Sequence, residues 1–332
     1  MFARHLVCTV LFFTAFQSFA AEVIKAGIIG ADTSHVTAFT ELLNSPKAEG
    51  DLAGIKVVAC YPSFSADIPS SKDRVEGYKT KLTSMGVELV GSIDDLLAKV
   101  DVVLLENVDG RTHLQQVIPV LKAKKPVFID KPVAGTLAEV LEVYRLAAEL
   151  NVPCFSSSAL RFGPGIFGSR TDARVGTVLG CDAYSPCSLE ASHPDLFWYG
   201  IHGVETLFTI MGPGCESVTR VQTKDTELVV GTWKDGRVGT FRGIREGKKD
   251  YGATVFGSKG IIQSGGFEGY KHLVAQIAKF FKTKAVPVSP EETIEIYAFM
   301  EAADESKRQG GKPVRLESVL TKARQQKPAL KP

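Results

Sequence analysis

A glycine-containing segment near the start of the chain has the position and residue types of a phosphate-binding turn. Residues 23–29 form a short apolar run that ends at Gly30, and polar residues follow from position 32. In a dinucleotide-binding domain, the pattern G-x-G-x-x-G makes a tight bend, lets the backbone approach a diphosphate and begins a helix. With Gly30 in the first place, Asp32 takes the second glycine position and His35 the third. The sequence therefore indicates a nucleotide-type turn that keeps only the first glycine.

The substituted positions change what this turn can bind. Asp32 brings a Cβ atom and a negative charge to the place of the diphosphate, which is unfavourable unless the loop shifts or the carboxylate is paired. Thr33 and Ser34 can still donate hydrogen bonds, and the helix N-terminus still favours an anion. The acidic residue expected roughly 20 or more residues further on, at the end of the second strand, is missing, because residues 60–63 read Cys-Tyr-Pro-Ser. An ordinary strand-to-helix turn with Asp32 as the N-cap is the alternative.

The first half of the chain alternates apolar runs with segments of helical spacing, which is typical of a parallel sheet covered on both faces. The expected strands are 23–29, 56–60, 89–90, 102–105, 127–129 and 153–156, and the expected helices are 34–43, 94–99, 113–123 and 137–150. The polar segment 62–74 is expected to be a loop near the ligand cleft.

The pattern changes in the second half. Residues 178–264 contain short alternating runs separated by turns, among them a hairpin at 234–236, and predict an antiparallel sheet. Two helices, 270–281 and 291–307, are expected to close the chain. The expected fold class is α/β, with an N-terminal Rossmann parallel sheet and a C-terminal α+β domain with a mostly antiparallel open sheet. The domains are 21–150 and 151–332, and a C-terminal helix is allowed to pack back on the first domain.

The first 20 residues are typical of a signal peptide. Arg4 and His5 precede the apolar run 6–16, and Ser18 and Ala20 place small residues at the −3 and −1 positions of a cleavage site. An N-terminal membrane anchor is the alternative, but 11 residues are fewer than the roughly 20 that a spanning helix needs. We expect export to the periplasm or the extracellular space and no membrane span after the signal is removed.

Composition excludes some partners. The formal charge is +2, and it becomes +1 without residues 1–20, which hold one Arg and no acid. This balance does not favour a nucleic-acid partner. Five cysteines remain after removal of the signal, and their spacing matches no zinc motif, so no metal site is expected. We interpret them as small buried residues; Cys181 and Cys187 could pair locally in an oxidising compartment.

Several further motifs together resemble the Gfo/Idh/MocA oxidoreductase family, named for glucose–fructose oxidoreductase and inositol dehydrogenase. Residues 102–106 lead through Asn107 to His113, and residues 125–132 follow with Asp130-Lys131-Pro132 where that family has Glu-Lys-Pro. The similarity continues through Arg161-Phe162, residues 176–180, residues 199–202 and the turn 256–260. The resemblance covers essentially the whole mature chain.

The resemblance implies a site at the carboxyl edge of the first sheet. It implies NAD or NADP as the cofactor, Lys131 beside nicotinamide and substrate, a cis peptide bond before Pro132, and His202 as a general base. The cofactor-binding candidates are Gly30, Asp32, Thr33, Ser34, His35, Asn107, His113, Asp130 and Lys131. The substrate candidates are Arg161, His193, Trp198 and Tyr199. Trp198 stands where the family usually has an aspartate, four residues before the histidine.

Three functions fit these observations. The first is an NAD(P)-dependent oxidoreductase that acts on a sugar, polyol or sugar derivative. The second is a non-redox carbohydrate-binding protein on the same fold, which the altered glycine loop favours. The third is an enzyme that cleaves or epimerises glycosides with tightly held NAD, which would suit an exported protein because no net cofactor is needed. A small-molecule carbohydrate is the expected partner in each case, and a homo-oligomer follows from the habit of the family.

Overall fold

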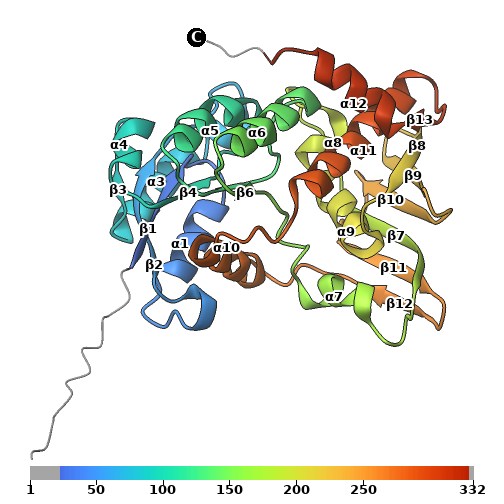
Figure 1. Cartoon of the computed structure of the whole chain (residues 1–332), viewed down its shortest axis with the longest axis horizontal. Coiled ribbons are helices and arrows are strands. Elements are labelled where there is room, and N and C mark those ends of the chain that lie inside the picture. Colours follow the sequence, from blue (N-terminus) through green and yellow to red (C-terminus); the bar gives the residue numbers. More distant parts are fainter. Residues whose placement is uncertain (1–22, 329–332) are drawn as a thin grey trace, which may run out of the picture.

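The first of two sheets is parallel and is formed by strands of the N-terminal half. A computed structural model describes residues 23–328 (Figure 1). Six strands lie in the order β3-β2-β1-β4-β5-β6, and each neighbouring pair is parallel. Their bounds are β1 Ile24–Ile29, β2 Ile55–Tyr61, β3 Glu88–Leu89, β4 Val102–Leu105, β5 Val127–Ile129 and β6 Cys154–Phe155. The order changes direction beside β1, so β1 and β4 flank a topological switch point, where open α/β sheets bind ligands.

Helices cover both faces of this sheet because successive strand residues point to opposite sides. Ile29 and Leu105 pack into one core, whereas their neighbours Ile28 and Leu104 pack into the other. The helices of this half are α1 His35–Leu43, α2 Pro69–Lys72, α3 Val75–Ser84, α4 Ile93–Leu97, α5 His113–Lys122 and α6 Leu137–Glu149. The predicted parallel sheet with two covered faces is confirmed.

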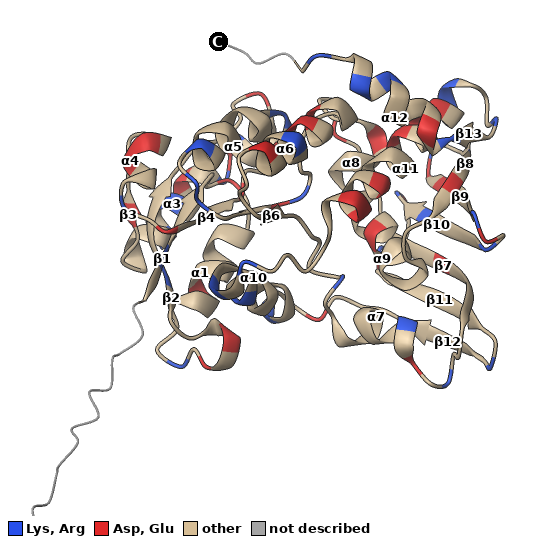
Figure 2. Ribbon diagram, viewed as in Figure 1, with Lys and Arg blue, Asp and Glu red and all other residues tan. Residues whose placement is uncertain are grey.

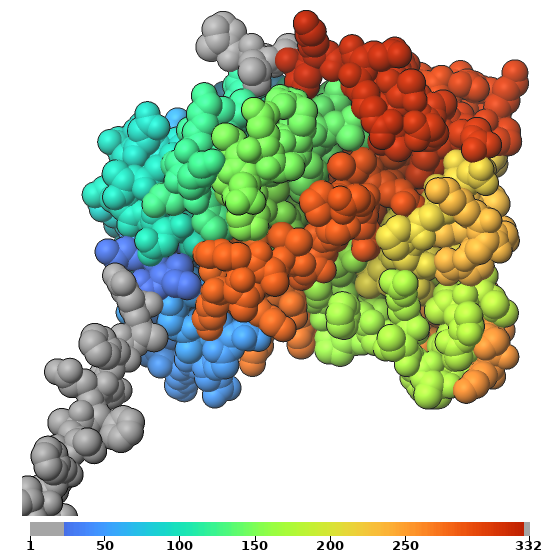
Figure 3. Space-filling view, in the orientation of Figure 1, coloured from blue at the N-terminus to red at the C-terminus, as the bar shows by residue number. Residues whose placement is uncertain are grey.

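Helix α10 (Lys271–Thr283) returns from the far end of the chain to complete the first core. Leu273, Ile277 and Phe280 of α10 are buried with strand residues of the first sheet. The ring of Phe280 meets that of Phe155 in β6 edge-on, at 5.0 Å between centroids. Figure 3 shows this orange segment lying against the blue and green N-terminal half. The structure thus places a C-terminal helix on the first domain.

The second sheet has seven strands in the order β12-β11-β7-β10-β9-β8-β13. Only the central pair of β7 and β10 is parallel, and the other described pairs are antiparallel. The bounds are β7 Val178–Pro186, β8 Cys215–Gln222, β9 Thr226–Trp233, β10 Val238–Ile244, β11 Gly252–Gly257, β12 Ile261–Ser264 and β13 Val314–Arg315. The predicted mostly antiparallel sheet and the hairpin between β9 and β10 are confirmed.

Helices α9 (Ile201–Met211) and α11 (Pro290–Arg308) cover one face of this sheet. Phe208 of α9 packs against Trp233 of β9 and Phe299 of α11, with 5.6 Å between ring centroids in both pairs. The short elements α7 Pro164–Phe167 and α8 Asp195–Trp198 lie on the connections that lead to α9. Every residue of α9 except His202 is buried.

The expectation that two helices close the chain is wrong, because α12 (Leu316–Gln325) follows them. Leu316, Val319 and Ala323 are buried at helical spacing, against α6 and α11. This periodic signal is present in the sequence, but the polar residues between these positions weaken it. Helix α3 was missed for the same reason, since Val75 and Leu82 are its only buried residues.

The five described cysteines are buried and unpaired, as the preferred interpretation predicted. Cys181 lies within β7 and Cys187 directly follows that strand. Six residues of extended chain span about 20 Å, and a disulfide needs Cα atoms within about 7 Å. The local disulfide is therefore not formed.

Basic and acidic residues are interspersed along the ribbon in both halves of the molecule (Figure 2). Among the described residues, no helix is long and apolar enough to cross a membrane. The predicted signal peptide lies outside the described residues.

Candidate functional site

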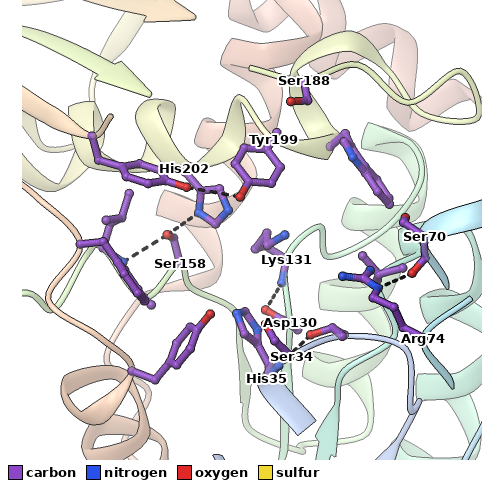
Figure 4. A pocket seen from close by; sticks show the side chains of 18 residues that line it. Ser34, His35, Ser70, Arg74, Asp130, Lys131, Ser158, Ser188, Tyr199 and His202 are labelled. Atoms are coloured by element: carbon purple, nitrogen blue, oxygen red, sulfur yellow. Dashed lines mark hydrogen bonds and ion pairs between the residues drawn. The ribbon is translucent and has the colours of Figure 1, made fainter. Parts of the chain in front are cut away.

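A cavity of about 480 Å³ lies between the two domains, above the carboxyl ends of β1 and β5. Eight of the sequence-predicted residues line it: Thr33, Ser34, His35, Asp130, Lys131, Trp198, Tyr199 and His202. The other lining residues include Ser70, Arg74, Ser158, Ser188, Tyr251 and Tyr270. Figure 4 shows side chains from both domains pointing toward this space.

The end of β5 supplies a carboxylate that is tied to the glycine loop. Asp130 is 1% exposed, and its Oδ2 lies 2.5 Å from His35 Nδ1. Its Oδ1 accepts a hydrogen bond from the Lys131 backbone N–H at 2.8 Å. Burial alone would raise the pKa of Asp130, but the charges of His35 and Lys131 and these hydrogen bonds outweigh it, so the pKa is lowered. Asp130 is therefore an anion that fixes His35 with Nε2 as its free ring nitrogen.

Lys131 follows directly and extends toward the second domain. Its Nζ lies 5.7 Å from the centroid of the Tyr199 ring, within the range of a cation–π contact. The Tyr251 hydroxyl donates to the Tyr199 hydroxyl at 3.3 Å on the same wall. The peptide bond between Lys131 and Pro132 is cis, as the resemblance implied. The ammonium group thus lies between the two domains.

His202, in the first turn of α9, faces Lys131 from the other domain. Its Nδ1 lies 2.7 Å from Ser158 Oγ, and its ring meets that of Tyr199 edge-on. Burial, followed by the positive charges of Lys131 and His35, holds the pKa of His202 well below its ordinary value of 6.5. The imidazole is therefore neutral at neutral pH and able to accept a proton.

Arg161 lies outside the cavity lining, in a buried ion-pair cluster. Its guanidinium contacts Glu205 and Glu292, each at 2.7 Å. Glu205 also accepts from the backbone N–H of Ser158 at 2.7 Å. These contacts hold the predicted substrate residue Arg161 in a buried cluster outside the cavity lining, and they position the serine that contacts His202.

Asp32, at the second glycine position, points away from the cavity. It is fully buried and accepts from the Ser71 hydroxyl at 2.7 Å and from the Val108 N–H at 3.0 Å. Burial raises the pKa of Asp32 despite these hydrogen bonds. The Asp32 carboxylate is thus paired with internal donors. This meets the condition given above for binding a diphosphate beside this loop.

Gly30 shows why the first glycine is kept. Its φ is +101°, and a Cβ atom there would lie 2.6 Å from the backbone nitrogen of Asn107. The Asn107 side chain in turn contacts Ser63 rather than the cavity. Gly30 and Asn107 therefore shape the floor of the crevice without lining the cavity.

Two predicted histidines also lie behind the cavity wall. His113 is fully buried, with Nε2 2.9 Å from the backbone oxygen of Asn107, and burial lowers its pKa. His193 Nε2 lies 3.2 Å from Asp109, and its ring is 4.8 Å from that of Trp198. Both support residues that lie closer to the cavity.

Sequence reasoning missed the residues that reach the cavity from unpredicted positions. Arg74 and Ser70 enter from the segment after β2, Ser158 from the end of β6, and Tyr270 from the start of α10. Only the expectation that residues 62–74 lie near the cleft pointed to any of them. Within residues 23–328, no three His, Cys, Asp or Glu side chains are grouped as a metal site.

Comparison with known proteins agrees with this geometry. Residues 24–158 match the profile of the GFO_IDH_MocA group, described as an oxidoreductase family with an NAD-binding Rossmann fold. This part of the chain is similar to the Gfo/Idh/MocA family, and the predicted NAD(P) cofactor agrees with the NAD-binding fold that describes that family. No curated protein matches the chain in sequence.

Solved structures share the whole fold at low sequence identity. GenD2 from gentamicin A biosynthesis, in complex with NAD, has a TM-score of 0.73 at 17% identity, over 94% of this chain and 99% of that one. A probable dehydrogenase from Thermotoga maritima has a TM-score of 0.73 at 21% identity, over 89% and 100%. Scyllo-inositol dehydrogenase from Lactobacillus casei, with NAD(H) and scyllo-inositol, has a TM-score of 0.70 at 15% identity, over 89% and 100%. The chain therefore has the fold of NAD(P)-binding oxidoreductases.

Proposed function

We propose that the protein is an NAD(P)-dependent dehydrogenase that acts on a sugar, polyol or sugar derivative, with Lys131 and His202 as its catalytic residues. The observation that carries this proposal is that Lys131 of the first domain and His202 of the second line one cavity together with the start of α1. The match of residues 24–158 to an oxidoreductase family supports the reaction class, and the scyllo-inositol in a structural neighbour supports the substrate class.

The cavity residues fit the nicotinamide and diphosphate part of the cofactor. Thr33 and Ser34 stand at the start of α1, where a helix N-terminus favours an anion, and Asp32 is paired elsewhere. Thr33 and Ser34 would hold the diphosphate, and Asp130 and Lys131 would lie beside nicotinamide. When bound, the cofactor supplies hydride acceptance or donation.

His202 is suited to take the proton of the substrate hydroxyl. Because its pKa is depressed, the ring is in the neutral form that a base requires. A proton on Nδ1 can be donated to Ser158 Oγ, which also accepts from the Leu160 N–H at 3.2 Å, leaving Nε2 as the basic nitrogen. The contact with Ser158 is therefore compatible with the tautomer that His202 needs.

Lys131 is suited to stabilise the oxygen from which the proton leaves. A fixed ammonium group favours negative charge that develops on an alkoxide or ketone oxygen. Trp198 and Tyr199 line the same wall and present aromatic faces to a sugar or polyol ring. The cavity thus combines a base, a cation and aromatic surface around one reacting carbon.

Reduction of NAD⁺ or NADP⁺ with inositols and other polyols tests this assignment. We expect Lys131→Ala and His202→Asn each to lower kcat by about 10²- to 10⁴-fold, the usual contribution of a positioned acid–base group. His272→Asn, on α10 outside the cavity lining, is the matched control and should leave turnover unchanged. Unchanged turnover in both cavity variants would refute the assignment.

Export and self-association remain part of the proposal. Residues 1–20 have the pattern of a signal peptide, so we expect the mature chain in the periplasm or outside the cell. Leu179, Val238 and Ile261 expose apolar side chains from β7, β10 and β12 of the second sheet, which supports a homo-oligomer.

A further inference from the structure

Residues 62–74, which we term the strap, cross the switch point of the first sheet. The strap leaves the end of β2, and the Ser63 carbonyl accepts from the Ala31 N–H at 3.0 Å, directly after β1. The same carbonyl accepts from the Asn107 side-chain amide at 3.1 Å, beyond the end of β4. The first residues of the strap therefore bridge the two loops that flank the crevice.

Further contacts hold the strap down along its length. The Ser65 hydroxyl donates to Asp109 at 2.6 Å, and Arg111 pairs with Asp67 at 2.9 Å. The Ser71 hydroxyl donates to Asp32 at 2.7 Å. Ser65, Ser71, Asp32 and Asp109 are each no more than 7% exposed. The substituted glycine position is thus one of the anchor points of the strap.

The strap crosses the edge of the sheet at which a Rossmann domain holds the adenosine half of a dinucleotide. In a Rossmann domain, this half lies over the carboxyl ends of the first strands, with its ribose held by an acid at the end of the second strand. Here that acid is missing, and the chain itself runs over this edge. The Ala31 and Val108 N–H groups beside the crevice are both taken up internally.

The residues that line the cavity show which part of the crevice is open. Within the described residues, its lining includes Thr33, Lys131 and His202 but no residue from 61–67 or 109–113. The strap reaches the cavity only through its last part, at Ser70 and Arg74, which Figure 4 shows together on one side. The open space therefore lies beside Thr33, Lys131 and His202, and not along the first residues of the strap.

We propose that the strap fills the adenosine half of the crevice, so that the site admits the nicotinamide half directly and a whole dinucleotide only after the strap is displaced. This inference rests on the proposed function, since it takes the cavity to bind nicotinamide. The anchors Ser65 and Ser71 then determine how readily the site discriminates between a mononucleotide and a dinucleotide.

Stopped-flow binding of reduced nicotinamide mononucleotide and of NADH to the full chain tests the proposal. The double variant Ser65→Ala/Ser71→Ala removes two anchors, so we expect NADH to associate about tenfold faster than with the unaltered protein. Association of the mononucleotide should change less than twofold. Ser84→Ala, which removes an exposed hydroxyl bonded within its own helix, is the control and should change neither rate.

Binding of the mononucleotide distinguishes failure of the strap inference from failure of the proposed function. If the mononucleotide binds and the double variant gives no faster NADH association, the strap is not the barrier and the inference is overturned. An equal acceleration for both ligands overturns it as well, because the strap would then cover the whole site. If neither ligand binds, the proposed function fails, and the inference falls with it.

Discussion

His202 and Lys131 are coupled by charge as well as by position. The Lys131 ammonium group is one of the causes that depress the pKa of His202, after burial and ahead of His35. Because the neutral imidazole is the base, activity falls only when the pH drops through this lowered pKa. The acid limb of kcat/KM should therefore lie below the ordinary histidine value of 6.5.

Lys131→Met removes the positive charge and tests this coupling. Protonation of His202 then becomes easier, so its pKa rises and the acid limb of the residual kcat/KM should move to higher pH. The measurement is a pH–rate profile of the variant beside the unaltered protein, with Lys259→Met, an exposed lysine of the second domain, as the control. An acid limb that stays in place, or moves to lower pH, would contradict the coupling.

At the scale of elements, α10 belongs with the sheet on which it packs rather than with its neighbours in sequence. Phe280 is fully buried against Phe155, in the core that also holds strand residues of the first sheet. Phe280→Ala should lower the free energy of unfolding by about 3–5 kcal/mol, the usual effect of removing a buried aromatic ring.

The region that Phe280→Ala destabilises shows whether α10 belongs with the first sheet or with the second. Hydrogen exchange should become faster in β1, β5 and β6, whereas the second sheet keeps its protection. Faster exchange confined to the second sheet would show that α10 stabilises that domain instead.

Local patterns predicted most elements, because each carries its own periodicity. The runs 102–105 and 127–129 coincide with β4 and β5, since both are buried on two faces and are apolar throughout. Helix α12 was missed because its apolar residues are few. The motif positions also predicted that Lys131 and His202 would share one site.

The strap and the burial of Arg161 could not be predicted. Each depends on partners far away in the chain: Ser71 meets Asp32, and Arg161 meets Glu292, 131 positions away. The sequence shows an arginine in either case, whether its guanidinium faces a substrate or two buried carboxylates. Only the fold decides between these environments.

At the scale of the whole molecule, the two domains complete one site. The first contributes the start of α1 and Lys131, and the second contributes His202, Trp198 and Tyr199. The departures from the glycine pattern are absorbed within the first domain, where Asp32 anchors the strap and His35 contacts Asp130. The altered loop is therefore compatible with a nicotinamide cofactor in the remaining cavity.

Calorimetric titration of the purified full chain with NAD⁺ and NADP⁺, after a check for nucleotide released on denaturation, tests this account most directly. We expect saturable heat with at least one of the two, or an adenine-absorbing nucleotide already bound. A protein that releases no nucleotide and gives no heat with either would contradict it, and the carbohydrate-binding alternative without redox chemistry would take its place.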